Sequence, residues 1–319
     1  MERIIIDGLS FSLPLFIMAI GGIYCERSGV INLALEGFQG IGAFSGALAA
    51  VLLMQRCGLS ADKAMYFSFI FAIAGAAVYS AIHALLSIKF KANQVISGVV
   101  LNILALSLTI YLTKVLNKTL FRQASDKFVL TVSERFNIPY ISDIPLIGAF
   151  FREIYPFEII VLLLAVIFWY ILYKTHYGML LRACGDNPQA VDAAGKSVAF
   201  VRTIAVLISG ALSGIAGICF SYSISGSFSS SSFVGYGYLS IAAMIFGNWK
   251  ILPTIAACLL FGFARSGGYF IVQKMSMPAS YSDLAMTLPY VMTLLLLLFF
   301  SKYNHAPRAL GETYDKGKR

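Results

Sequence analysis

The sequence predicts an all-α integral membrane protein, a polytopic bundle of about 8–10 transmembrane helices with one short cytoplasmic helix. Of the 319 residues, 59% are hydrophobic and 12% are charged, and the mean hydropathy is +0.80. Soluble domains carry about 25% charged residues. Apolar runs such as 161–170 and 291–300 are continuous, whereas the strands of a membrane barrel alternate apolar and polar residues. The membrane spans are therefore helical.

Apolar segments follow one another along the chain, and we expect each to form a helix. The segment 283–301 is the cleanest. The segment 236–249 is short for a crossing, which needs about 20 residues, so it is either a short crossing or a re-entrant element. The others lie at 4–23, 30–54, 64–88, 94–116, 157–173, 200–222 and 251–271.

Lysine and arginine residues predict the orientation, because positive charge gathers on the cytoplasmic side of a membrane. We expect one membrane domain over 1–319, with a cytoplasmic loop at about 174–200 and a cytoplasmic tail at 302–319. The longest polar stretch, at about 117–156, is then extracytoplasmic. The first segment has no small-residue cleavage site, so we expect a retained helix.

Several function classes are excluded by the residue patterns. The net charge of +9 lies at span ends, which does not indicate a nucleic-acid partner. The five cysteines form no CxxC pair, and no HExxH, GxSxG or GxxxxGK[ST] motif occurs. We therefore expect no enzyme, no metal site and no cofactor bound by this chain.

A polar island at 184–197 carries the signals of a short, capped helix. Asn187 suits the N-cap, Pro188 the first helical position and Gly195 the residue past the end. About seven residues of helix remain, and a helix this short is marginal alone in water. We expect a partner surface to hold it.

Polar residues inside apolar segments are candidates for a translocation path or gate, because polar and charged groups within a bilayer are costly unless paired or hydrated. Asn32 and Glu36 lie in the second segment. Asn93, Ser97 and Asn102 begin the fourth, and we expect Asn93 and Ser97 to stack on one helix face. Their alternative role is bonding between neighbouring helices.

Three further features have plainer interpretations. Glu26 and Arg27 are interpreted as an interfacial pair that ends the first helix, with a place in the translocation path or gate as the alternative. Asp7 stands alone in the first segment, at the interface. The stretch 225–238, rich in serine, glycine and aromatic residues, is interpreted as an outer-face connection, with a mobile gate or docking site as the alternative.

Four stretches carry a family resemblance. They are Gly-Gly-Ile-Tyr-Cys-Glu-Arg-Ser-Gly and its continuation at 21–37, Ala-Asn-Gln-Val-Ile-Ser-Gly at 92–98, Gly-Asp-Asn-Pro-Gln-Ala-Val-Asp-Ala-Ala-Gly at 185–195, and Gly-Tyr-Leu-Ser-Ile-Ala-Ala-Met-Ile-Phe-Gly-Asn-Trp at 237–249. Together and in order, they resemble the permease subunits of bacterial ABC importers of the branched-chain amino acid, ribose and simple-sugar class. The resemblance covers nearly the whole chain and is greatest for the nucleoside branch, which works with basic-membrane-lipoprotein-type binding proteins.

The resemblance implies that the island is a coupling helix docking in a cleft of a separate ABC ATPase, which binds ATP and magnesium. Lys196 and Ser197 depart from the more apolar family pattern just after this helix. Further implied partners are a second permease subunit, often a non-identical one, and an extracytoplasmic substrate-binding lipoprotein. The implied coupling residues are Gly185, Asp186, Asn187, Pro188, Ala190, Ala194 and Gly195.

The implied function is ATP-driven uptake of nucleosides across the bacterial inner (plasma) membrane, with this chain as a multi-pass permease subunit. Two alternatives remain open at this stage. The same machinery could import riboflavin or a simple sugar. An ion-coupled secondary transporter would need no ATPase, and Glu36 would then be its titrating carboxylate.

Overall fold

The computed structural model confirms a polytopic helical bundle and describes residues 2–131, 135–140, 142, 144, 148–278, 280–300 and 304–315. Seven helices in this part of the chain are long and apolar enough to cross a membrane. They are α1 (Glu2–Arg27), α2 (Leu35–Cys57), α3 (Ala61–Ala84) with its π-helical end η1 (Leu85–Lys89), α4 (Gln94–Leu120), α5 (Pro156–Lys174), α8 (Val198–Phe220) with its π-helical end η3 (Ser221–Ser225), and α10 (Ile251–Lys274).

The other helices are shorter. α9 (Tyr236–Phe246) has 11 residues, too few to cross a bilayer that needs about 20. The segment 283–301, expected as the cleanest crossing, is divided between α11 (Ser280–Ala285) and α12 (Leu288–Phe300) by a turn at 286–287. The remaining short helices are α6 (His176–Asp186), α7 (Pro188–Ala193) and the 3-10 helix η2 (Gly148–Phe151).

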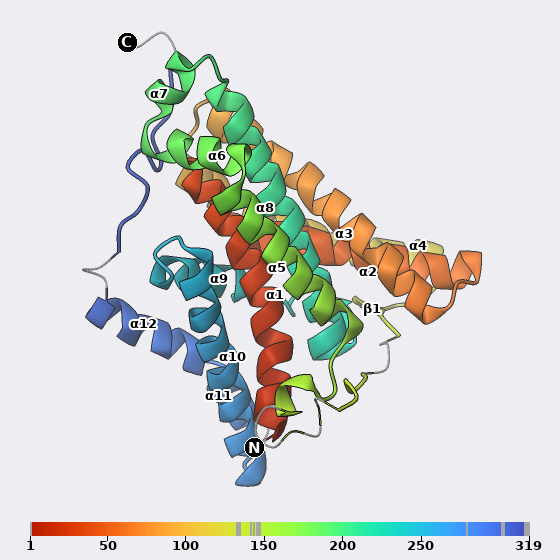
Figure 1. The fold of residues 1–319 in the computed structure, drawn as a ribbon. Helices are drawn as coiled ribbons and strands as arrows, with labels where there is room; N and C mark the ends of the chain where they lie inside the picture. The colour runs from red at the N-terminus through yellow and green to blue at the C-terminus, as the bar shows by residue number, and fades with distance from the viewer. Residues whose placement is uncertain are drawn as a thin grey trace.

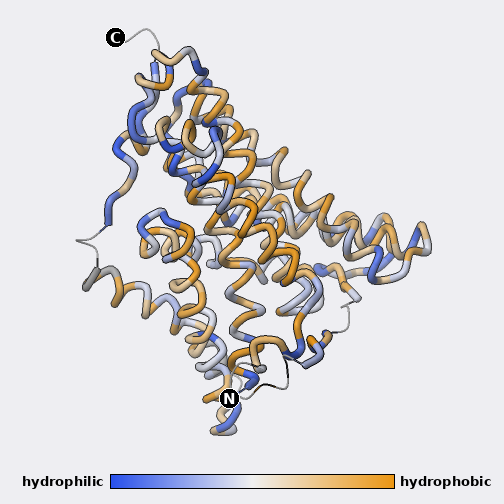
Figure 2. Tube along the Cα trace, viewed as in Figure 1, coloured by the Kyte–Doolittle hydropathy of each residue, from blue (hydrophilic) through white to orange (hydrophobic). Residues whose placement is uncertain are grey.

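The centre of the bundle is formed by α1, α2 and α8. Their apolar windows are 78%, 72% and 72% buried, whereas those of α3, α4, α5 and α10 are buried for about a third. Glycines let these central backbones approach closely, since a Cβ on Gly42 of α2 would collide with Gly214 of α8. The helices around this centre leave their apolar outer faces for lipid (Figures 1 and 2).

A two-stranded antiparallel sheet joins two distant loops. β1 (Lys127–Val129) pairs with β2 (Ser227–Ser229), and Phe128 lies opposite Phe228. Their rings stack at 6.2 Å, and both contact Phe44 of α2. The sheet therefore holds Lys127–Val129, within the predicted polar stretch, beside Ser227–Ser229 of the serine-rich stretch.

Hydrophilic residues gather at the ends of the bundle. Figure 2 shows them around α6, α7 and the C-terminal segment at one end, and in the loop beside the N-terminus at the other. The amide of Ala309 donates to the carbonyl of Gly185, which holds the segment 304–315 against the end of α6. Residues 302, 303 and 316–319 of the predicted tail lie outside the described residues.

Candidate functional site

The polar island folds as two helices, α6 and α7, at the end of the bundle that also carries the C-terminal segment (Figure 1). The three predicted helix signals are confirmed. The Asn187 side chain accepts a hydrogen bond from the Ala190 amide at 3.1 Å, Pro188 is the first residue of α7, and Gly195 has a φ of +74° just past its end. α7 has six residues, close to the expected seven.

The outer side of α7 is open. Val191 is buried and anchors the helix, whereas Asn187, Ala190, Ala194 and Gly195 are exposed. Nothing lies within 4 Å of a Cβ placed on Gly195. Gly185 and the exposed Asp186 end α6 instead. The predicted coupling residues therefore divide between an exposed helix and the end of a packed one.

Gly185 makes a close backbone contact between α6 and the end of the membrane helix α1. It is buried, and a Cβ at this position would collide with the carbonyl oxygen of Arg27 at the end of α1. Only glycine allows this approach. A displacement of α6 would therefore act directly on the end of α1.

The chain is irregular between α1 and α2, and this break gathers buried polar groups. Glu26 is 5% exposed, and its Oε2 accepts a 2.6 Å hydrogen bond from the indole Nε1 of Trp249. Arg27 donates from Nε to the carbonyl of Trp249 at 3.0 Å. The first helix does end at Arg27, as expected, but Glu26 is not an exposed end residue, because the turn between α9 and α10 covers it.

Asn32 lies in the break and is fully buried. Its Nδ2 donates to the hydroxyl of Ser209 in α8 at 2.8 Å, and its Oδ1 accepts from the amide of Ala34 at 3.0 Å. The amide side chain thereby ties the interrupted backbone to the central helix α8.

Glu36 sits in the first turn of α2 and is 8% exposed. Its Oε2 accepts a 2.7 Å hydrogen bond from the amide of Gly235, which precedes α9. A carboxylate at a helix N-terminus bonds free amides and is favoured by the helix dipole. Glu36 therefore caps the short helix α9 from inside the bundle.

Asn102 and Ser97 bind the same region from α4. Asn102 accepts from the amide of Gly37 at 2.7 Å and donates to the carbonyl of Leu33 at 2.7 Å. The hydroxyl of Ser97 lies 2.9 Å from Nδ1 of His83, whose Nε2 lies 3.1 Å from the carbonyl of Ile31. The contribution of His83 could not be seen in the sequence, where its partners lie far away.

Asn93 stands apart from this group. It is exposed and caps α4 by accepting from the amides of Val95 and Ile96 at 3.0 and 3.1 Å. The expectation that Asn93 and Ser97 stack on one helix face is wrong, because Asn93 precedes the helix as its N-cap. Four of the five predicted path residues therefore converge on the break between α1 and α2, and Asn93 does not.

Two adjoining cavities, of about 330 and 370 Å³, lie between α1, η3, α10 and the turn before α12. Both are lined by Phe11, Ile224, Arg265 and Met286, and by none of the five predicted path residues. Sequence reasoning missed Arg265. The feature of the sequence that could have identified Arg265 is its position as a charged residue inside the apolar segment 251–271, because such residues mark functional sites.

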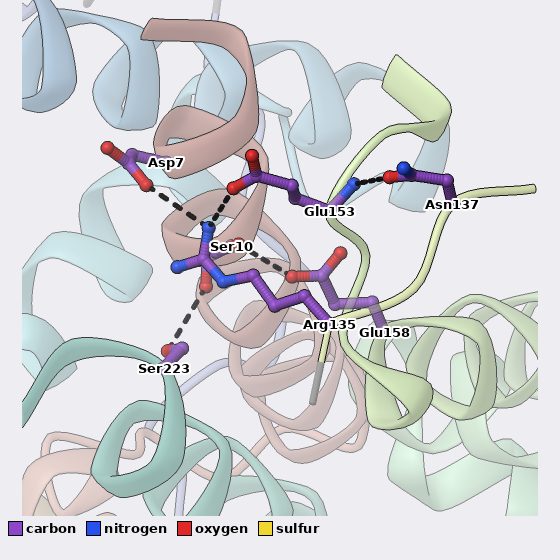
Figure 3. A network of polar contacts seen from close by, with 7 residues as sticks. All are labelled: Asp7, Ser10, Arg135, Asn137, Glu153, Glu158 and Ser223. Carbon is purple, nitrogen blue, oxygen red and sulfur yellow. Dashed lines mark hydrogen bonds and ion pairs between the residues drawn. The ribbon is translucent and has the colours of Figure 1, made fainter. Parts of the chain in front are cut away.

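An arginine network borders the first cavity at the N-terminal end of α1 (Figure 3). Nη1 of Arg135 lies 3.4 Å from Glu153 Oε2 and 3.7 Å from Asp7 Oδ1, so Asp7 is paired rather than lone. The guanidinium carbon lies 4.5 Å from the ring centroid of Tyr155. Burial lowers the pKa of Arg135, but its contacts with Tyr155, Asp7 and Glu153 outweigh burial and raise the pKa. The guanidinium stays charged.

No group of three or more His, Cys, Asp or Glu side chains in the described part of the chain could hold a metal ion. What the geometry provides is a break in the helical bundle held by buried hydrogen bonds, a cavity lined by polar and apolar side chains nearer the N-terminal end of α1, and an exposed helix at the opposite end. These features define a multi-pass membrane permease.

The chain belongs to the family described as branched-chain amino acid transport system / permease component, which it matches over residues 4–299. It is thus the permease component of an ABC importer and not itself an enzyme. Such a component works with an ATPase and a substrate-binding protein. Membership of this family excludes the alternative of an ion-coupled secondary transporter, because an ABC permease component works with an ATPase.

Relatives match over nearly their whole length. The guanosine ABC transporter permease protein NupQ of Bacillus subtilis (strain 168) is 37% identical, covering 98% of this chain and 96% of NupQ. The nucleoside ABC transporter permease protein NupC of Lactococcus lactis subsp. cremoris is 35% identical, covering 100% of this chain and 98% of NupC. No solved structure matches the chain.

Proposed function

We propose that this chain is a permease subunit that carries nucleosides across the membrane. The observation that carries the proposal is its full-length similarity to NupQ and NupC, whose names state guanosine and nucleoside transport. The putative glucose ABC transporter permease protein TsgC13 of Haloferax volcanii is 30% identical and covers 78% of this chain. The nucleoside relatives thus match more of the chain at higher identity, which favours nucleosides over sugars.

ATP, with magnesium, is bound and hydrolysed by a separate ATPase subunit, on which α7 docks. The exposed face of α7 and its single buried anchor, Val191, support this role. Gly185 and Asp186 then carry the movement of the ATPase to the end of α1, since Gly185 packs on the Arg27 carbonyl. The break at 28–34 is the first part of the membrane bundle that this movement reaches.

A second, non-identical permease subunit completes the membrane pore. A second guanosine ABC transporter permease protein of Bacillus subtilis (strain 168), NupP, is also similar, at 27% identity over 91% of this chain. An extracytoplasmic binding lipoprotein delivers the solute to the side of the bundle that carries β1 and β2. The lipid bilayer contacts the exposed apolar faces of α3, α4 and α5.

The test is uptake of labelled guanosine by proteoliposomes that contain this chain, its second permease, the ATPase and the binding protein. We expect uptake that needs ATP and is reduced by unlabelled adenosine. Riboflavin and ribose serve as competitors, and an ATPase subunit with its catalytic carboxylate removed serves as the control. Uptake reduced by riboflavin or ribose instead of nucleosides would contradict the proposed solute.

A further inference from the structure

The two adjoining cavities have the size of a small-molecule site. Their volumes of about 330 and 370 Å³ lie within the range of about 300–1,000 Å³ that ligand pockets occupy. The residues that they share, Phe11 and Arg265 among them, make them neighbouring parts of one hollow. We refer to this hollow as the Arg265 cavity.

Arg265 is unusual because it lies in the interior of α10, within a membrane-spanning segment. Charged side chains at such positions are costly and mark functional pathways. Among the side chains that the structure describes, no carboxylate lies within ion-pair distance of Arg265. A guanidinium has five N–H donors and no acceptor. Its Nη2 lies 3.5 Å from the hydroxyl of Tyr236, which uses one donor weakly.

Aromatic rings hold this guanidinium in place. Its carbon lies 4.6 Å from the ring centroid of Phe11 and 5.9 Å from that of Tyr236. Phe11, Tyr236 and Phe220 contact one another with centroid distances of 4.9 to 5.3 Å. The cavity therefore places apolar ring surface from Phe11 and Tyr236, whose rings stand at 88° to each other, beside a fixed set of hydrogen-bond donors.

Serine hydroxyls line part of the cavity, among apolar side chains such as Ile224 and Met286. Ser223 and Ser266 contribute to the first part, and Ser225, Ser231 and Ser232 to the second. Serine hydroxyls both donate and accept hydrogen bonds, so they suit the hydroxyls of a sugar. Most of these serines come from the stretch 225–238 and from η3, where that stretch begins. The stretch therefore forms part of the cavity lining in addition to connecting two helices.

We propose that the Arg265 cavity binds the transported solute, and that it favours a 6-oxopurine nucleoside such as guanosine. The inference rests on the proposed function. Arg265 donates to O6 and N7 of the base, the pairing that arginine makes with guanine elsewhere. Phe11 and Tyr236, which stand at 88° to each other, supply apolar contacts to the base, and the serine hydroxyls bind the ribose.

The preference follows from donor and acceptor chemistry. Guanine and hypoxanthine present two acceptors, O6 and N7, on this edge, whereas adenine presents an N6 donor beside N7. Arg265 has no acceptor to meet N6. Glutamine has both an acceptor and a donor, and it pairs with the N6 and N7 of adenine.

The cavity lies on the side expected to receive the solute. Asp7 and Arg135 line its first part, and both lie at the N-terminal end of α1 (Figure 3). Figure 1 shows that end opposite α6, α7 and the C-terminal segment. A solute released onto the sheet side therefore meets the cavity before it reaches the break at 28–34.

The first test compares guanosine and adenosine uptake by the complete transporter with Arg265→Gln, Arg265→Lys and Lys274→Gln. Uptake of each solute is divided by the wild-type value, so the selectivity of the binding protein cancels. We expect Arg265→Gln to lower relative guanosine uptake about fivefold or more below relative adenosine uptake. Arg265→Lys keeps the charge but loses the planar donor pair, so guanosine uptake falls here too. Lys274→Gln, at the exposed end of the same helix, leaves both unchanged.

The second test detects contact directly. Ser232→Cys places a thiol in the second part of the cavity, and native Cys57 is an exposed internal control away from it. A methanethiosulfonate reagent is applied to the complete transporter with binding protein, with and without guanosine. We expect guanosine to slow labelling of Cys at 232 and to leave the labelling rate of Cys57 unchanged.

The outcomes separate the two proposals. A wild-type transporter that imports no nucleoside overturns both the proposed function and this inference. Nucleoside import with equal losses of guanosine and adenosine in Arg265→Gln, and no protection at position 232, overturns the inference alone. In that case Arg265 would have only a structural role.

Discussion

The amide nitrogen of Ala309 lies 2.8 Å from the carbonyl oxygen of Gly185, and this hydrogen bond joins the C-terminal segment to the end of α6. The neighbouring Gly311 donates to the carbonyl of Gly29 at 3.0 Å. The buried Arg202 of α8 donates to the carbonyls of Ser28 at 3.1 Å and Glu312 at 2.7 Å. The segment 304–315 thus links the coupling region to the break between α1 and α2.

Replacing Gly195 with valine should uncouple import from ATP hydrolysis. Gly195 has a φ of +74°, and a left-handed residue other than glycine costs about 1–2 kcal/mol. The C-terminal end of α7 would then rearrange where the ATPase docks. We expect ATP hydrolysis to persist while guanosine uptake falls, both measured in proteoliposomes.

Gly58 offers a matched control, since it also has a positive φ of +64° and nothing within 4 Å of an added Cβ. It lies between α2 and α3, away from α7. Gly58→Val should cost similar stability without uncoupling. Equal transport in Gly195→Val and the wild type would count against the coupling role of α7.

Replacing Ala309 with proline should weaken the link between the C-terminal segment and α6. Proline has no amide hydrogen, so the bond to Gly185 is lost. A lost hydrogen bond of this kind costs about 0.5–1.5 kcal/mol, and leaving the buried carbonyl unpaired costs more. We expect a lower melting temperature in detergent and less guanosine imported per ATP. Ala309→Gly keeps the amide and adds no polar group at this buried position, so it should lose less stability and less coupling than Ala309→Pro.

Replacing Trp249 with phenylalanine should destabilise the protein. It removes the donor to the buried Glu26 carboxylate, and an unpaired buried group costs about 1–3 kcal/mol or more when charged. The other tryptophan, Trp169, has a partly exposed ring that packs on Tyr173 and donates no side-chain hydrogen bond that we observe. Trp169→Phe is therefore the control in thermal unfolding. A similar small loss in both variants would show that the Glu26 bond contributes little.

Thiol labelling should modify one of the five cysteines. Cys57 is exposed, and Cys25, Cys184, Cys219 and Cys258 are buried. For Cys184, which lies outside the membrane spans, burial raises the pKa of the thiol, although Arg202 opposes the shift. A raised thiol pKa leaves less of the reactive thiolate at neutral pH. Mass spectrometry should find one maleimide on the native protein, none on Cys57→Ser, and five after unfolding.

The helical class of the protein and the cap signals of α7 could be read from the sequence because both are local. Continuous apolar runs need only the residues of one helix to predict a span. Asn187, Pro188 and Gly195 act within a single helical turn of their own positions. The lengths of α9 and of the helices in the last segment could not be predicted from the sequence in the same way. Where a helix breaks depends on which other parts of the chain pack against it.

The role of Glu26, the position of Asn93 and the importance of Arg265 were decided by the tertiary structure. The sequence places Glu26 at the polar end of the first helix, but its burial depends on Trp249, which lies far along the chain. The guanidinium of Arg265 is held by the rings of Phe11 from α1 and Tyr236 from α9, and the sequence does not show that these residues are neighbours. Contacts between distant residues leave no periodic pattern in one sequence, because burial and hydrogen-bond partners arise only when the helices pack.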